Sequence, residues 1–165
     1  MKTKIFLLIL VVMCFIGIYG VLAKTQNNFL FTEDEAKTFN LSEEEWYSKP
    51  YAERGLESGP LIVLESPQFN ETENGIIIES PSPLDLQVEF KENKYPIDMN
   101  SFFAWVQKGL LKKNLTERLR NHINGTKLDV KSLSVPVGKY SIRVEISDLK
   151  GNKTIGTYKL KVTKK

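Results

Sequence analysis

Chemistry in this chain would have to rest on carboxylates, because the residues that usually supply nucleophiles and soft metal ligands are nearly absent. The 165 residues include one cysteine, Cys14, and one histidine, His122. Cys14 lies in an apolar leader, so a chain without the leader has no thiolate, no disulfide and no cysteine-bound metal. His122 has no partner in the sequence pattern, and we interpret it as structural.

Acidic residues cluster twice near the N-terminus, at Glu33–Glu35 and at Glu43–Glu45. Clustered carboxylates could bind a metal ion or act as acids and bases. However, Thr32 and Ser42 precede the two clusters with the spacing of a capping box, and acids at helix starts interact favourably with the helix dipole. We therefore predict two short helices, each too short to be stable alone in water.

Four turn residues with side-chain oxygen atoms form a second candidate metal site. They are Asp98, Asn100, Asp148 and Asn152, which could ligate calcium if their loops met at one end of the fold. Asp and Asn also bond their own main chain in turns, which explains them without a ligand. We expect no bound cofactor and no metal ion.

Basic residues gather in the stretch from Lys108 to Gly125, which the sequence predicts to be an inserted helix. Leu115, Leu119 and Ile123 repeat at helical spacing, and Asn114 with Glu117 has the spacing of a capping box. The basic side chains around this stripe are Lys112, Lys113, Arg118 and Arg120. They could bind an anionic lipid or polysaccharide, or they could be an ordinary solvated helix face.

Phe103 and Trp105 form the other candidate partner surface. They alternate with Phe102, Ala104 and Val106, so the two sets occupy opposite faces of one strand. If the smaller set faces the core, Phe103 and Trp105 lie on the outer face. We expect residues 31–51, which contain several large apolar side chains, to pack near Phe103 or Trp105. The alternative is that Trp105 lies in the core and this segment docks elsewhere or stays free.

The charge balance argues against nucleic acid as a partner. The formal net charge is +3, but Lys2 and Lys4 precede the predicted cleavage site, which leaves 21 basic and 20 acidic residues. A nucleic-acid-binding protein normally has a concentrated basic surface. Hydrophobic residues at 41% and charged residues at 26% are typical of a globular chain, which excludes a disordered or fibrous protein.

Residues 1–23 have the pattern of an export signal. Two lysines precede an uncharged run from Ile5 to Ala23, with small residues near its end. Cleavage before Lys24 would release the chain. The same run reaches about 28 Å as a helix, enough to anchor the protein in a membrane if it stays uncut. A lipid anchor through Cys14 is the third alternative.

The C-terminal part predicts paired β-strands. Apolar and polar residues alternate from Tyr140 to Ile146, and again from Tyr158 to Val162, with a turn at Asp148 and Gly151 between them. Ile155 is out of phase, so we expect a bulge beside Gly156. Further short strands with frequent turn residues indicate an all-β sandwich.

Residues 60–165 resemble the bacterial immunoglobulin-like domains. The resemblance rests on four groups of residues: Val88-Glu89-Phe90; Pro96-Ile97-Asp98 with Ser101-Phe102; Val135-Pro136-Val137-Gly138-Lys139-Tyr140; and Asp148 with Gly151-Asn152. It implies an immunoglobulin-like β-sandwich, and because such domains serve adhesion, enzymes and envelope scaffolds alike, it leaves function open. The chain departs from the family at Lys108–Gly125 and in lacking tandem repeats.

These observations predict three parts: a signal peptide or anchor at 1–23, an acidic helical segment and linker at 24–59, and the sandwich with one inserted short helix at 60–165. We expect an exported protein, periplasmic, extracellular or membrane-anchored. We expect it to act without catalysis, by binding or scaffolding a protein or glycan of the cell envelope. The alternatives are a carbohydrate-binding module and a carboxylate-dependent accessory to a glycan hydrolase.

Overall fold

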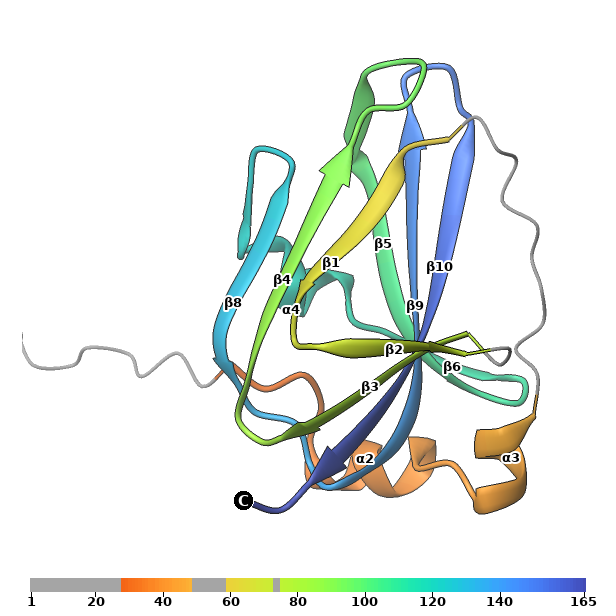
Figure 1. Ribbon diagram of the computed structural model, residues 1–165, viewed down its shortest axis with the longest axis vertical. Coiled ribbons are helices and arrows are strands. Elements are labelled where there is room, and N and C mark those ends of the chain that lie inside the picture. Colours follow the sequence, from red (N-terminus) through yellow and green to blue (C-terminus); the bar gives the residue numbers. More distant parts are fainter. Residues whose placement is uncertain (1–27, 49–58, 73–74) are drawn as a thin grey trace, which may run out of the picture.

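The computed structural model describes residues 28–48, 59–72 and 75–165, which fold into two packed β-sheets with short helices at one side (Figure 1). The leader and residues 24–27 lie outside the described part of the chain. Within that part, no helix is long and apolar enough to cross a membrane. The strands are β1 (Leu61–Ser66), β2 (Phe69–Thr72), β3 (Gly75–Pro81), β4 (Leu84–Lys91), β5 (Ile97–Lys108), β6 (Leu111–Asn114), β7 (Ile123–Asn124), β8 (Lys127–Leu133), β9 (Gly138–Asp148) and β10 (Lys153–Thr163).

The strand order is that of an immunoglobulin-like sandwich. One sheet has the order β1-β4-β8-β7, and the other has the order β2-β3-β10-β9-β5-β6. The pairing of β3 with β10 is parallel, while the other pairings are antiparallel. Tyr140, near the start of β9, donates its hydroxyl to the Pro136 carbonyl at 3.0 Å, the arrangement known as a tyrosine corner in this fold. Burial raises the pKa of Tyr140 to about 12. The predicted fold class is confirmed.

Alternation along the strands builds the core between the sheets. In β5, Phe102, Ala104 and Val106 are almost fully buried and belong to the core, so the smaller of the two alternating sets faces inward. The predicted hairpin also forms, because β9 and β10 pair from Ser147 and Lys153 outward, around a turn with Gly151 at a φ of 81°.

The predicted bulge beside Gly156 is wrong. Pairing continues through Ile155↔Glu145 and Gly156↔Val144 without a shift in register. A Cβ added to Gly156 would meet the Tyr158 ring at 2.8 Å, so this position lacks a side chain to make room for that ring. Ile155 is out of phase because it lies on the outer face, while Gly156 occupies the core-facing position.

The inserted helix is much shorter than predicted. The stretch from Lys108 to Gly125 forms the β5–β6 hairpin, the five-residue helix α4 (Thr116–Arg120) and the short strand β7. The predicted capping box is absent from α4: the Asn114 side chain accepts a bond from the Thr116 amide, and no side chain caps the helix at its N-cap residue. Gly125 does not end this helix; it lies in the β7–β8 turn with a φ of 59°.

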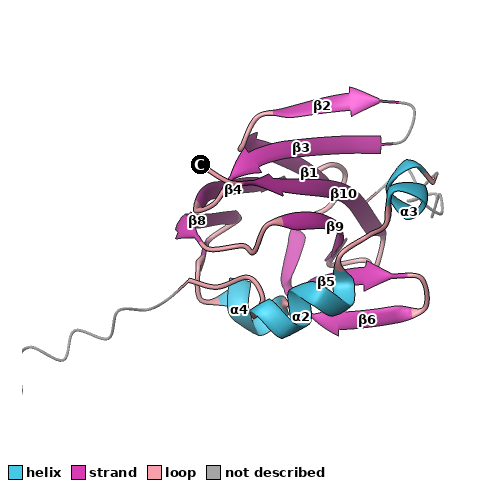
Figure 2. Cartoon of the chain, turned by 90° about the horizontal axis from the view of Figure 1, so that it is seen from below, coloured by secondary structure: helices cyan, strands magenta, loops and turns pink. Residues whose placement is uncertain are grey.

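The N-terminal segment forms the two predicted short helices, α2 (Glu33–Phe39) and α3 (Glu43–Tyr47). Both predicted capping boxes are confirmed, since Thr32 with Glu35 and Ser42 with Glu45 each make the two reciprocal bonds. Helix α2 lies with α4 along the β5–β6 side of the sandwich (Figure 2). Its apolar residues join the core, which therefore includes side chains from both sides of residue 60.

Candidate binding site

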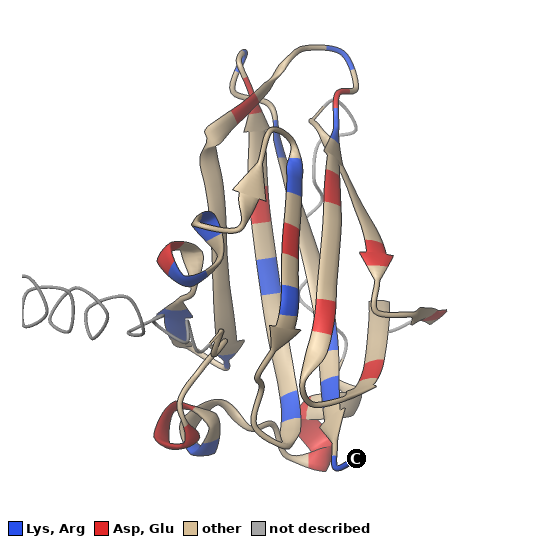
Figure 3. Cartoon of the chain, turned by 90° about the vertical axis from the view of Figure 1, so that its left-hand side faces the viewer, with Lys and Arg blue, Asp and Glu red and all other residues tan. Residues whose placement is uncertain are grey.

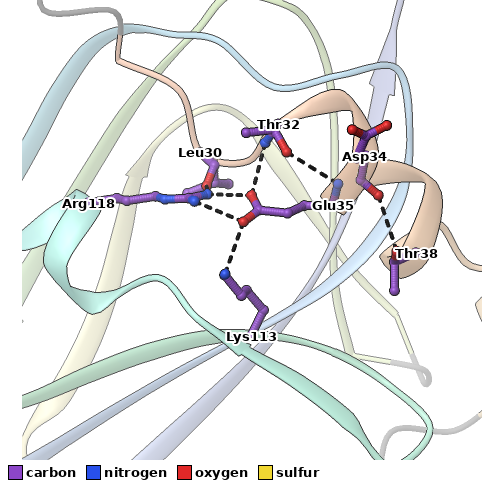
Figure 4. A network of polar contacts seen from close by, with 7 residues as sticks. All are labelled: Leu30, Thr32, Asp34, Glu35, Thr38, Lys113 and Arg118. Atoms are coloured by element: carbon purple, nitrogen blue, oxygen red, sulfur yellow. Dashed lines mark hydrogen bonds and ion pairs between the residues drawn. The ribbon is translucent and has the colours of Figure 1, made fainter.

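An ion-pair cluster attaches the N-terminal segment to the sandwich. Arg118 of α4 binds both carboxylate oxygens of Glu35, at 2.7 and 2.9 Å, and the Leu30 carbonyl at 2.7 Å (Figure 4). Lys113 of β6 lies 3.1 Å from the same carboxylate. The Arg118 hydrogen bond is the main cause that lowers the pKa of Glu35 to about 2. The cluster joins α2, α4 and β6 through one carboxylate.

Helix α3 is held by two lysines of the neighbouring strands. Lys159 of β10 is 4% exposed and donates to two carbonyls at the end of α3, those of Trp46 and, at 2.7 Å, Ser48. Burial lowers the pKa of Lys159. Lys139 pairs with Glu43, and both ammonium groups lie within 6 Å of the Trp46 ring centroid, at 5.7 and 5.8 Å. Carbonyls at a helix C-terminus attract cations, which explains this arrangement.

The N-terminal segment packs on the sandwich at more than one place. Residues 28–48 do pack on the sandwich, but Phe31 and Phe39 enter the core itself, and Trp46 lies by the lysines of β9 and β10. The cover of Phe103 and Trp105 by this segment therefore stays a prediction. Residues 49–51 lie outside the described residues.

Three of the four predicted basic partner residues have roles within the fold. Lys113 and Arg118 bind Glu35, as described above, and Arg120 donates to the Phe102 carbonyl at 3.1 Å. Lys112 has its ammonium 5.5 Å from the centroid of the Trp105 ring and stays exposed to solvent. Lys113 and Arg118 therefore bind the chain's own acidic segment, which satisfies two of the charges that the sequence suggested were available to a partner.

The two aromatic candidates differ in exposure. Phe103 is 40% exposed, whereas Trp105 is 5% exposed, although both lie on the outer face of β5. Their ring centroids are 5.3 Å apart with planes inclined by 40°, and Trp105 donates its ring N–H to Gln107 at 3.2 Å. A sugar-binding platform needs exposed, coplanar rings, and this pair offers one partly exposed ring.

The turn residues considered for calcium bond their own main chain. The Asp148 carboxylate accepts bonds from the amides of Lys150 and Asn152, at 2.8 and 2.9 Å, and from the Asn152 side chain at 2.7 Å. Desolvation alone would raise the pKa of Asp148, but these bonds together lower it. Asp98 likewise accepts from the Asn100 amide at 3.0 Å. Among the described residues, no group of three His, Cys, Asp or Glu side chains could hold a metal ion.

The outer face of the four-stranded sheet has charges that pair with one another. Acidic and basic residues alternate along β8, beside the mainly acidic β4 (Figure 3). Glu89 pairs with Lys91 at 3.1 Å and Lys127 at 3.4 Å, and Lys131 lies 3.2 Å from Asp129. Opposite charges at this spacing leave a solvated face with little net charge.

A groove of about 480 Å³ lies beside the N-terminal segment. It lies where residues 29–33 pass the β8–β9 connection, and Leu30 and Ser134 fix this crossing by a 3.0 Å main-chain bond. Its lining residues are the apolar Phe29, Phe31, Val135, Pro136 and Val137 and the polar Thr32, Glu33, Ser82 and Ser134. We call this feature the end groove.

The end groove is suited to an apolar group of a partner. Phe29 is 50% exposed and Val137 is 54% exposed, so both keep large apolar surfaces in contact with water. Its volume lies within the usual range of ligand pockets. Glu33 is the one carboxylate among the described lining residues, which gives the rim a single negative charge. Apolar walls with a few polar groups favour binding over acid–base chemistry.

Sequence reasoning could not find the end groove, because its walls come from segments about 100 residues apart. The exposed hairpin tip at Leu110 and Leu111 was also missed, although Lys108-Gly109 offered a turn signal. The helical spacing of Leu115 and Leu119 predicted a helix in this stretch instead of a hairpin.

Comparison with known proteins identifies no family for this chain. No family model matches the sequence, and no curated protein matches it. Among solved structures, that of murine CRIg aligns with 63% of this chain and 99% of its own, at 14% identity and a TM-score of 0.34. An identity and a TM-score this low carry no argument about what this chain binds. The strand order and the tyrosine corner carry the immunoglobulin-like assignment.

Proposed function

We propose that this chain is an exported module of the cell envelope that binds or scaffolds a partner protein and does not catalyse a reaction. The end groove carries the proposal. Its walls include two large apolar side chains, Phe29 and Val137, that are each about half exposed. Partly exposed apolar side chains around a concave surface are typical of sites that bind a partner.

The partner chemistry follows from the lining of the end groove. Apolar walls accept an aliphatic or aromatic side chain, and Glu33 at the rim would favour a basic group beside it. We therefore infer an extended protein segment with an apolar residue next to a lysine or arginine. A protein of the cell envelope is the class that an exported chain would meet.

The two alternatives receive less support. A carbohydrate-binding module would present exposed coplanar rings, and the burial and tilt of Trp105 argue against such a platform. A glycan hydrolase accessory would need two carboxyl groups in one cleft. Glu33 is a single carboxylate in the groove, and Glu35 is held by Arg118.

Val137→Glu tests the proposal, because it places a charge in the groove at a position that is 54% exposed and makes little demand on the core. Photo-cross-linking from position 29 in cells should yield a defined adduct with the native chain and lose it in the Val137→Glu chain. Leu149→Glu, at an exposed turn on another part of the molecule, is the matched control. If the adduct still forms in the Val137→Glu chain, the end groove is not the binding site.

Export is tested separately. The leader has two lysines before an apolar run, which is the pattern of a secretory signal or anchor. Fusing residues 1–30 to a reporter that works only outside the cytoplasm should give an active reporter, and Lys2 and Lys4 predict that orientation. An inactive reporter in intact, expressing cells would contradict export.

A further inference from the structure

The tip of the β5–β6 hairpin has apolar side chains that the fold does not use. Lys108 pairs with Leu111, so Gly109 and Leu110 form the two-residue turn, and Gly109 has a φ of 55°. Leu110 is fully exposed and Leu111 is 56% exposed. Two neighbouring leucines at a protruding turn are costly in water unless something covers them.

The charged residues around the tip indicate the chemistry of a surface that would bind it. Between Asp98 and Glu117 the sequence has three lysines, Lys108, Lys112 and Lys113, and no acidic residue. Lys112 is exposed beside the Trp105 ring. Lys108 and Lys113 pair with Glu45 and Glu35 but keep side-chain exposures of 29% and 44%. Apolar residues flanked by lysines complement a bilayer with anionic headgroups.

We propose that the β5–β6 hairpin tip inserts Leu110 and Leu111 into the interface of an anionic lipid bilayer, with Lys112 at headgroup level. Lysine can extend its ammonium toward the headgroups while its methylene stem stays by the apolar residues. This contact is separate from the end groove and from the leader, and it holds whether or not the partner of the end groove exists.

The decisive measurement is depth-dependent quenching with the full chain. Cys14→Ser removes the native thiol, and Leu110→Cys then accepts a single fluorescent label at the tip. Leu149→Cys provides the matched control, because Leu149 is 65% exposed at the β9–β10 turn. Vesicles of phosphatidylcholine with or without phosphatidylglycerol contain a nitroxide in the acyl region. The label at position 110 should be quenched in the anionic vesicles, and the label at 149 should not.

Two variants separate the apolar and ionic contributions. Lys112→Glu should raise the concentration of anionic lipid needed for half-maximal quenching at the tip by about fivefold or more. Leu110→Glu with Leu111→Glu should weaken vesicle binding by about tenfold or more when the leader has been removed by the exporting cell. Circular dichroism checks that each variant keeps its strands.

Three outcomes would overturn the proposal. Quenching at position 110 could equal that at 149, or neutral vesicles could quench as strongly as anionic ones. Alternatively, the label at 110 could become shielded without lipid as protein concentration rises, which would assign the tip to contact between copies of the chain. Loss of the cross-linked adduct in the end groove would leave this result unchanged, so the two proposals fail independently.

Discussion

Replacing Glu35 with glutamine should destabilise the fold in a pH-dependent way. The carboxylate binds Arg118 and Lys113, and its pKa is lowered from 4.5 to about 2. A difference of that size corresponds to at most ~3 kcal/mol at neutral pH. The Glu35 side chain is 19% exposed and that of Arg118 is 32% exposed, so solvent screening reduces the expected loss to about 1–2 kcal/mol.

The sign of the pH dependence follows from proton binding. Because the pKa of Glu35 is lower in the folded chain, the unfolded chain binds more protons between about pH 4.5 and pH 2. The contribution of Glu35 is therefore complete above pH 4.5 and is lost as the pH falls toward 2. The difference in free energy of unfolding between the native chain and Glu35→Gln should shrink over the same interval.

Urea unfolding at several pH values between 7 and 2 measures this difference. Asp34→Asn is the matched control, since Asp34 pairs with Lys37 on the same helix, and its side chain is 92% exposed. That control should change the free energy of unfolding by less than about 0.5 kcal/mol. Equal losses in both variants, or a loss for Glu35→Gln that stays constant down to pH 2, would refute the role assigned to the cluster.

Three further predictions concern other parts of the structure. Phe31→Ala should cost about 3–5 kcal/mol in urea unfolding, because Phe31 is 1% exposed in the core; a loss below 1 kcal/mol would contradict its place there. Lys159→Met removes two bonds to carbonyls at the end of α3, so hydrogen exchange in residues 44–48 should accelerate while β9 stays protected. EDTA should leave the melting temperature unchanged, since the oxygens of Asp148 already accept protein hydrogen bonds; a drop of several degrees would restore the calcium reading.

The sequence predicts well those features that neighbouring residues determine. Capping at Thr32 and Ser42 depends on a residue three positions later, so the pattern identifies both helix starts. Alternation in β5 separates its two faces for the same reason, and the structure shows which of them is in the core. The β9–β10 turn at Gly151 is also a local feature.

Long-range pairing explains the errors between Lys108 and Gly125. Leu115 and Leu119 are both buried, as a helical stripe predicts, but the preceding residues pair with β5 through Trp105↔Asn114. Strand pairing satisfies the main chain of this stretch, so the helix begins only at Thr116. Helical spacing over two turns cannot distinguish these arrangements, because both bury the same leucines.

The N-terminal segment shows why the candidate site had to come from the structure. When considered separately, its acidic residues offered a metal ion or acid–base site, and the basic residues of the sandwich offered a site for an anionic partner. Glu35 and Arg118 are 83 residues apart in sequence and form a bidentate pair. The pair satisfies both charges inside the chain, so neither is available to a partner.

This attachment also determines how closely the leader and the sandwich are coupled. Asn28 donates its side-chain amide to the Lys131 carbonyl at 3.0 Å, and its own carbonyl accepts from the Ser134 amide at 2.7 Å. Residues 24–27 therefore separate the leader from a residue bonded to β8, and four residues span at most about 14 Å. If the leader stays in a membrane, the end groove, whose wall begins at Phe29, must lie near that membrane. A partner segment of the end groove would then be one that is accessible at the bilayer surface.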